Sequence, residues 1–338
     1  MQYWFSGYGG QNGGTPLPSL MLYEPDVFPQ TRCTDLTPGL SWLAETDDGR
    51  LIACKEDDNS GAVMLFKIEG ETLSLLDSRQ IDGTAFCHLS WWEKHRVVAG
   101  ACYGSGDIFT LQVTENGFGE MRSYIHQDAP DNGLTRAHCI IANAAETTAY
   151  VSNIALDRLY LYDIAEDGSL QNERFVQLTE GDGIRHLLLR EDQQRLYATT
   201  EYQNVVYSFD MSGEMPVLLG KIPSLTADYV MKSYHSGLVM NKAGTRLYVG
   251  NRGANTITVF ATGADTPTGL TRLTEAPVCG DWPRDISLIP DESHIISCNQ
   301  RSNSITFLPI DENGIPGTPD RVIPFIAPSF AGFRKNTY

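Results

Sequence analysis

An arginine and a glutamate stand at the two ends of one short stretch of the chain. In GIRHLLLREDQQRLYATTEYQN, Arg185 opens an apolar run, a polar turn follows, and Glu201 closes the next apolar run sixteen residues later. A guanidinium can hold a carboxylate or phosphate through two hydrogen bonds, and a carboxylate can act as a general base. The pair therefore has the residue types for chemistry on an anionic substrate, or it is a structural ion pair that braces the fold.

The pattern around this pair recurs along the chain. An apolar run, a polar turn, a second apolar run, another turn and an alternating segment appear six times. Their equivalent positions are Leu40, Cys87, His138, Arg185, Ser236 and Arg284. These positions are separated by 47, 51, 47, 51 and 48 residues. Units of about 48 residues, with β-branched and aromatic residues between turn signals, are typical of β-propeller blades.

The two ends of the chain supply a seventh unit. YWFSGYGG and SLMLYEP near the N-terminus resemble the second and third strands of a unit, and PSFAGF near the C-terminus resembles the first. Joining both ends in one blade would close the ring and remove exposed sheet edges. We therefore expect an all-β, seven-bladed β-propeller with four-stranded antiparallel blades, as a single domain over residues 1–338. The regular spacing disfavours a β-sandwich or two stacked β domains.

The repeat also predicts where certain side chains gather. The first strand of a propeller blade lines the channel and the second returns antiparallel, so the start of one lies beside the end of the other. Residues sixteen apart then form pairs at one channel mouth. The pairs are Leu40/Glu56, Cys87/Tyr103, His138/Ile154, Arg185/Glu201, Ser236/Arg252 and Arg284/Gln300. A purely structural repeat would place similar residues here, but these residues differ, which favours a site carried on a repeated scaffold.

Ring closure would bring the charged members of these pairs together. They are His138, Arg185, Arg284, Glu56, Glu201 and Arg252. Three arginines and a histidine would make an anion site, and the two carboxylates could be held ionised or poised as bases. A small-molecule anion fits such a site.

Polar neighbours complete the expected substrate site. Arg284, Gln300, Tyr103, Glu56 and Asn251 are the candidate substrate-binding residues. Structural alternatives stay open for several candidates. His138 could be a hydrogen-bonded interior histidine, Glu56 could be solvated in its acidic turn, and Tyr103 could pack in the channel.

Composition excludes several classes of function. A formal net charge of −17 disfavours nucleic acid and anionic membrane surfaces as partners. The chain has no apolar stretch long enough to span a membrane, and its start lacks the features of a signal peptide. Seven cysteines, all scattered singly, favour a reduced cytoplasmic protein. No nucleotide, metal or serine-hydrolase motif is present, so no cofactor or metal is expected, and the oligomeric state is left open.

Several segments together resemble the seven-bladed propeller lactonases. This family includes a bacterial type of 6-phosphogluconolactonase and fungal carboxy-cis,cis-muconate cyclase. The resemblance covers nearly the whole chain and is strongest from Arg136 to Leu308. The segments that carry it are AHC, SNIALDRLYLYDIAEDGSL, GIRHLLL, TTEYQNVVYSF, RLYVGNRGANTITVF and WPRDISL with SCNQRSNSITF.

The resemblance implies an active site made of a histidine, two arginines and a glutamate. By position these fall on His138, Arg185, Glu201 and Arg252. The implied activity is hydrolysis of 6-phosphogluconolactone to 6-phosphogluconate in the pentose phosphate route. The sequence leaves open a muconate-type cyclase, a lactonase for an unphosphorylated lactone, and a non-catalytic propeller that binds an anion or a protein. It also leaves open whether Glu201, which we favour, or His138 is the base.

The chain departs from the family pattern at four positions. Ile184 replaces the usual proline, Thr200 replaces the usual asparagine, Gly237 stands where an acidic residue is common, and Asn153 replaces a common aspartate. The four core groups are intact, so the departures affect the expected substrate and not the expected class of chemistry.

Overall fold

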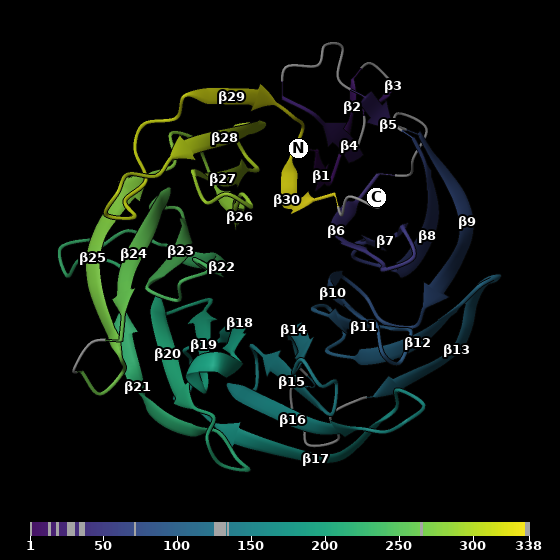
Figure 1. Ribbon diagram of the computed structural model, residues 1–338, viewed down its shortest axis with the longest axis horizontal. Coiled ribbons are helices and arrows are strands. Elements are labelled where there is room, and N and C mark those ends of the chain that lie inside the picture. The colour runs from purple at the N-terminus through teal and green to yellow at the C-terminus, as the bar shows by residue number, and fades with distance from the viewer. Residues whose placement is uncertain are drawn as a thin grey trace. The chain divides into compact units, whose positions relative to one another are not determined.

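The computed structural model describes residues 2–12, 15–17, 20–25, 31–33, 38–70, 72–124, 133, 135–263 and 266–334. The chain forms two compact units, one with residues 1–177 and 328–338 and the other with residues 178–327. A single domain over residues 1–338 stays a prediction. Among the described residues, no helix has the length and apolar character to cross a membrane. Figure 1 labels the strands in chain order.

Three four-stranded antiparallel meanders lie in the first unit, and each strand pairs with the next along the chain. The first consists of β6 (Leu40–Glu45), β7 (Arg50–Lys55), β8 (Gly61–Glu69) and β9 (Thr72–Ile81). The second consists of β10 (Phe86–Trp92), β11 (Val97–Cys102), β12 (Ile108–Thr114) and β13 (Gly117–Tyr124). The third consists of β14 (Ala137–Ala142), β15 (Thr148–Asn153), β16 (Arg158–Ile164) and β17 (Leu170–Gln177).

A fourth meander of this unit joins the two ends of the chain. Its order is β30 (Pro328–Phe333), β1 (Tyr3–Gly7), β4 (Leu20–Tyr23) and β5 (Thr31–Cys33). In Figure 1 the yellow β30 lies beside the purple β1, and Tyr3 pairs with Phe333. A short hairpin, β2 (Gly10–Asn12) with β3 (Thr15–Leu17), interrupts the meander. The predicted composite of N-terminal second and third strands with a C-terminal first strand is confirmed.

The second unit contains three further meanders of the same kind. The first consists of β18 (Ile184–Arg190), β19 (Arg195–Thr200), β20 (Val205–Asp210) and β21 (Val217–Pro223), with a one-turn 3-10 helix η1 (Glu191–Gln193). The next consists of β22 (Tyr234–Met240), β23 (Arg246–Arg252), β24 (Thr256–Thr262) and β25 (Leu270–Pro277). The last consists of β26 (Pro283–Leu288), β27 (His294–Asn299), β28 (Ser304–Pro309) and β29 (Arg321–Pro324).

The burial pattern explains why the second and third strands read as continuous apolar runs. Every residue of β11 is buried, whereas the outermost strand β17 is mostly exposed and alternates. A strand covered on both faces needs apolar residues at every position, and a half-covered strand needs them at every second one. The cores accordingly lie between neighbouring meanders, such as the cluster of Tyr248, Ile257 and Ile286 from β23, β24 and β26.

The predicted turn signals also mark real turns. Gly49, Gly168 and Gly314 have φ values of 76°, 76° and 82°. A residue with a side chain is strained in this left-handed region, which is why glycine follows Asp or Asn at these corners.

Each of the six first strands from β6 to β26 carries a register shift near its start. The residues displaced from regular pairing are Ser41, Cys87, His138, Arg185, Ser236 and Arg284, with a neighbouring residue also displaced beside Arg185 and Ser236. A β-bulge of this kind takes a side chain out of the normal alternation and re-aims it. Five of these six positions are the equivalent positions predicted from the sequence.

The position predicted at Leu40 is wrong by one residue. Leu40 pairs with Lys55 as Phe86 pairs with Cys102, so Ser41 is the equivalent of Cys87. Leu40 is fully buried in the core. The spacing in this unit is therefore fifteen residues, because the hairpin of β6 and β7 is one residue shorter than that of β10 and β11.

Candidate functional site

Arg185 occupies the bulge at the start of β18, and it is only 1% exposed. Its Nε donates to Oε2 of Glu201 at 2.9 Å, and its Nη1 donates to the carbonyl oxygen of Ser236 at 3.1 Å. Ser236 lies in the bulge of β22, a strand that packs against β18. The guanidinium therefore links two neighbouring first strands while it holds the carboxylate.

Glu201 comes directly after the last residue of β19. Its backbone N–H donates to the carbonyl oxygen of Gly183 at 2.6 Å, which extends the pairing of β18 and β19 by one step. Oε2 receives Arg185 and lies 3.3 Å from Nη2 of Arg252. No described residue donates to Oε1, and the side chain is 13% exposed. One carboxylate oxygen is thus fixed by two arginines, and the other is left for water or a ligand.

The charge of Glu201 follows from its neighbours. Burial raises the pKa of this carboxyl group, but Arg252, Arg185 and Arg284 outweigh burial and hold the pKa below its ordinary value. Nearby cations favour the ionised form of a carboxyl group. Glu201 is therefore a carboxylate at neutral pH.

Arg252 is the last residue of β23 and is 6% exposed. Its Nε and Nη2 donate to the carbonyl oxygen of His235 at 3.1 and 2.7 Å. Burial and the repulsion from Arg185 lower the pKa of Arg252 to about 9, although Glu201 raises it. Arg252 stays charged at neutral pH, and Arg185, Arg252 and Arg284 together act on the single carboxylate of Glu201, so the cluster holds more positive than negative charge. A further anion would relieve this imbalance.

Arg284 and Gln300 lie at the same end of the next meander. Arg284 occupies the bulge of β26, is partly exposed, and acts electrostatically on both Glu201 and Arg252. Gln300 follows β27, is partly exposed, and donates its backbone N–H to the carbonyl oxygen of Trp282 at 3.0 Å. The second unit therefore brings Arg185, Glu201, Arg252 and Arg284 into one electrostatic cluster.

Asn251, which the sequence analysis placed in the substrate site, has a different environment. It is fully buried, and its Nδ2 donates to the hydroxyls of Thr256 and Thr258 at 3.0 and 2.9 Å. Its Oδ1 accepts from Ser224 Oγ at 3.2 Å. Thr256 and Thr258, with Ser224 of the segment before β22, thus hold both ends of the amide, and these contacts favour a structural role for Asn251 over its predicted place in the substrate site.

His235 belongs to the same buried network. Its Nδ1 accepts the backbone N–H of Thr200 at 3.2 Å, so the ring proton lies on Nε2, which is 2.6 Å from Ser224 Oγ. Burial, with repulsion from Arg252 and Arg185, lowers the pKa of His235 to about 3. The ring is neutral and is held from both sides.

In the first unit, His138 lies in the bulge of β14 and is 3% exposed. The ring of Tyr103 meets it edge-on, with centroids 6.1 Å apart, and Arg136 Nη1 donates to the Tyr103 hydroxyl at 2.8 Å. Glu56 is partly exposed, and its Oε2 accepts from the hydroxyl of Tyr8 at 3.0 Å. This unit thus assembles His138 with Tyr103 and a further arginine, Arg136, which the sequence reasoning passed over.

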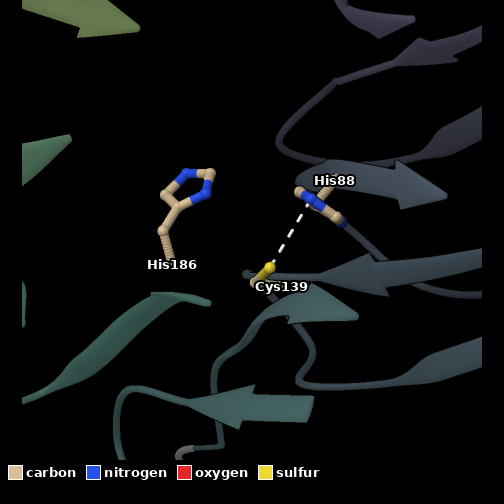
Figure 2. A group of neighbouring side chains, drawn as sticks. All are labelled: His88, Cys139 and His186. Atoms are coloured by element: carbon tan, nitrogen blue, oxygen red, sulfur yellow. Dashed lines mark hydrogen bonds between the residues drawn. The ribbon is translucent and has the colours of Figure 1, made fainter. Parts of the chain in front are cut away.

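A buried histidine and cysteine in the first unit were also missed. Figure 2 shows the Nε2 of His88 facing the Sγ of Cys139, and the two atoms lie 3.5 Å apart. The backbone N–H of Ile140 donates to His88 Nδ1 at 3.4 Å, and the ring packs on Trp42 with centroids 4.7 Å apart. A search for ligand spacing within one segment could not find this pair. The available signal was their equivalent position in the repeat, because each is the third residue of the strand that begins its meander.

Comparisons with known proteins agree with this architecture. A family model described as "Lactonase, 7-bladed beta-propeller" matches residues 30–318. A 6-phosphogluconolactonase of Bacillus subtilis (strain 168) is 25% identical over 274 residues, covering 78% of this chain and 77% of the relative. A 6-phosphogluconolactonase of Klebsiella pneumoniae (strain 342) is 24% identical over 237 residues, covering 68% of each chain.

Two solved structures show the fold. The periplasmic gluconolactonase PpgL of Pseudomonas aeruginosa has a TM-score of 0.88 at 20% identity, with 99% of each chain covered. A putative 6-phosphogluconolactonase of Bacteroides fragilis NCTC 9343 has a TM-score of 0.85 at 17% identity, with 98% of this chain and 97% of the other covered. These matches confirm the predicted all-β propeller fold. Because the family model spans well over half of the sequence, the chain belongs to the seven-bladed β-propeller lactonase family.

Proposed function

We propose that this protein hydrolyses a sugar-acid lactone, with 6-phosphogluconolactone as its substrate, at the cluster of Arg185, Glu201, Arg252 and Arg284. One observation carries the proposal. A buried carboxylate is ionised between arginines that outnumber it, and one of its oxygens is left without a donor from the described residues. The names of the curated relatives support the choice of substrate.

In the proposed reaction, water attacks the carbonyl carbon of the lactone. Glu201 Oε1 accepts a proton from that water, and the carbonyl oxygen becomes an oxyanion. Arg252 stabilises the oxyanion, and Arg284 binds the phosphate or carboxylate of the substrate. The bond from carbon to the ring oxygen then breaks, the ring oxygen takes up the proton, and the open sugar acid leaves. Arg185 fixes Oε2, so the carboxylate keeps its orientation through the cycle.

His138 keeps the role that the resemblance implies, as the second acid–base group. It would protonate the departing ring oxygen and take a proton back from solvent, while Glu201 releases its own proton to solvent, or it would share the role of base with Glu201. A His138→Gln variant tests this role. If His138 delivers the proton, kcat falls by about 10²-fold or more while KM changes little.

The deciding experiment measures hydrolysis of freshly generated 6-phosphogluconolactone, with the spontaneous rate subtracted. The wild type is compared with Arg185→Ala and Glu201→Gln, and with Glu214→Gln, an exposed glutamate of the same unit, as the matched control. We expect turnover in the wild type and the control, and a loss of about 10²–10⁴-fold in the two site variants. Full activity in folded Glu201→Gln would contradict the proposed base.

Two further expectations belong to the same assay. EDTA should leave turnover unchanged, since no step of the proposed reaction uses a metal. If the wild type is silent, a panel of unphosphorylated sugar lactones and muconates tests the other substrates of the class. Silence on the whole panel would favour a non-catalytic anion-binding propeller.

We also propose a cytoplasmic location. Of the described cysteines, Cys54, Cys87, Cys102, Cys139 and Cys298 are buried free thiols and Cys279 is an exposed one. Unpaired thiols are typical of reducing compartments. Fractionation of the source cells tests this location, and recovery from the periplasm, the compartment named for the Pseudomonas aeruginosa protein, would contradict it.

A further inference from the structure

Trp282 has a backbone conformation that large residues seldom adopt. It directly precedes β26, and its φ is +64°. In this left-handed region a bulky side chain is an outlier, and glycine or asparagine is the usual occupant. Gly39, Ala85, Gly183 and Ala327 hold the same left-handed position directly before a first strand, so the fold repeats this conformation, and Trp282 is the largest of the five residues placed in it.

Several hydrogen bonds impose this conformation. The backbone N–H of Trp282 donates to Asn255 Oδ1 at 2.9 Å, and its carbonyl oxygen accepts the N–H of Gln300 at 3.0 Å. Asn255 Nδ2 also donates to Asp281 Oδ1 at 2.9 Å. The hydrogen bonds from Asn255 and Gln300, which we call the clamp, thus hold the backbone on both sides of Trp282. The clamp fixes the backbone from which the indole extends.

The clamp places the indole beside the arginine cluster. The Cζ of Arg252 lies 5.6 Å from the centre of the Trp282 ring and 5.7 Å from that of Tyr234, and the two rings are 5.8 Å apart. Arg301 stacks on the indole, with its Cζ 3.4 Å from the ring centre. Trp282 and Tyr234 are partly exposed, whereas Arg252 is buried. A ligand that reaches Arg252 from solvent therefore meets aromatic surface next to the charge.

We propose that Trp282, together with Tyr234, forms an aromatic wall on which the ring of the substrate packs, so that Trp282 selects cyclic, sugar-type ligands over open-chain acids. This inference rests on the proposed function. A sugar lactone has a C–H face and a polar edge, and the wall next to Arg252 offers a surface for each. The open sugar acid has no such ring face, so the wall also favours release of the product.

Binding experiments test the wall without relying on turnover. The probes are glucose 6-phosphate, a stable cyclic sugar phosphate, and 6-phosphogluconate, its open-chain acid. Affinities are measured by calorimetry for the wild type, Trp282→Gly and Trp282→Phe. Glycine removes the ring and adopts positive φ freely, so this variant keeps the clamp and the fold. Trp91→Phe, which changes a tryptophan of the other unit, is the control.

We expect Trp282→Gly to weaken binding of glucose 6-phosphate by roughly tenfold and binding of 6-phosphogluconate by less than about threefold. Trp282→Phe should retain most of the affinity for the cyclic probe, and Trp91→Phe should change neither affinity. Tryptophan fluorescence should respond to glucose 6-phosphate in the wild type and much less in Trp282→Phe.

Equal weakening for both probes, or no weakening, would overturn the inference. Binding of neither probe by the wild type would overturn it as well. Turnover of 6-phosphogluconolactone by the same preparation then shows that the proposed function stands without the wall. A kcat loss in Trp282→Gly with unchanged affinities would assign Trp282 to positioning Arg252, which also contradicts substrate packing.

Discussion

Two adjacent columns of the repeat have opposite characters. The residue before the sixteen-residue partner position is asparagine in three meanders, at Asn153, Asn251 and Asn299, and all three are fully buried. The next residue along the chain varies between meanders, from Tyr103 and Ile154 to Glu201 and Arg252. Two neighbouring columns can therefore have different roles. A repeated residue type indicates a structural role, and a varied one indicates a functional site.

The asparagines of the second unit make equivalent contacts. Asn251 donates to Thr258, whose hydroxyl donates to the carbonyl oxygen of Ser224 at 3.0 Å. Asn299 donates to Thr306, whose hydroxyl donates to the carbonyl oxygen of Val278 at 3.0 Å. Each asparagine thus ties the crossover segment before its meander to the second and third strands. In the adjacent column, Glu201 and Arg252 form an ion pair instead. Their cluster has an excess of positive charge that can bind an anionic ligand.

The largest expected effect is a loss of activity on substitution of Arg252, in the varied column. Arg252→Lys keeps one positive charge but loses the planar fork that holds the His235 carbonyl oxygen and faces Glu201. We expect kcat/KM to fall by about 10²–10³-fold, measured with the lactone assay. Arg195→Lys, at a partly exposed ion pair with Asp210, is the matched control and should be nearly neutral. A comparable loss of kcat/KM in both variants would contradict a special role for the column that contains Arg252.

Lowering the pH should destabilise the protein through His235, which belongs to the buried structural network. Burial holds the pKa of His235 near 3, against 6.5 in the unfolded chain. The unfolded chain therefore binds a proton below about pH 6.5 that the folded protein refuses. The free energy of unfolding should fall as pH drops from 6.5 towards 3, by up to about 1.4 kcal/mol per pH unit. Urea titrations at several pH values measure this slope, and a His235→Asn variant should lack this contribution. An unchanged slope in that variant would contradict the assignment.

Truncation of the asparagine column should lower stability and spare catalysis. Asn251→Ala and Asn299→Ala each remove buried hydrogen bonds, so the free energy of unfolding should fall by about 2 kcal/mol in either variant. Urea denaturation measures the loss, and kcat per folded molecule should stay within about twofold of the wild type. A kcat loss in Asn251→Ala alone would return that residue to the substrate site.

The smallest effect is expected where the column lacks its asparagine. Thr200 occupies the equivalent position at the end of β19, and its hydroxyl exchanges hydrogen bonds with the backbone of Val205 at 3.0 Å. Thr200→Asn restores the repeated residue, and the free energy of unfolding should change by less than about 1 kcal/mol, with kcat unaffected. A large change in KM would show that this position also shapes the substrate site.

The sequence was a good guide to the strands and a weaker guide to their register. The order of strands and the composite terminal sheet followed from repeated apolar runs and turn signals, which depend on local burial and backbone freedom. The approach of Arg185 to Glu201 followed from the antiparallel return of the second strand. These features need no knowledge of side-chain packing.

Other features depend on contacts that no local pattern records. A bulge has no preferred residue type, so Arg185, Cys87 and Ser236 could not be recognised as displaced, and Leu40 was chosen in place of Ser41. Asn251 was assigned to the substrate site because it adjoins Arg252, and its hydrogen bonds to Thr258 and Ser224 come from segments that the sequence does not place beside it. Trp282 was not recognised as left-handed, because glycine or alanine occupies the equivalent position at Gly39, Ala85, Gly183 and Ala327.

The pairing of β30 with β1 joins two segments that lie far apart in the sequence, while β4 covers the other edge of β1. Loss of β30 would leave one edge of β1 unpaired beside residues that are otherwise buried, such as Trp4 and Phe5. An open edge of this kind can pair with another chain, so proteolysis that releases β30 should promote self-association.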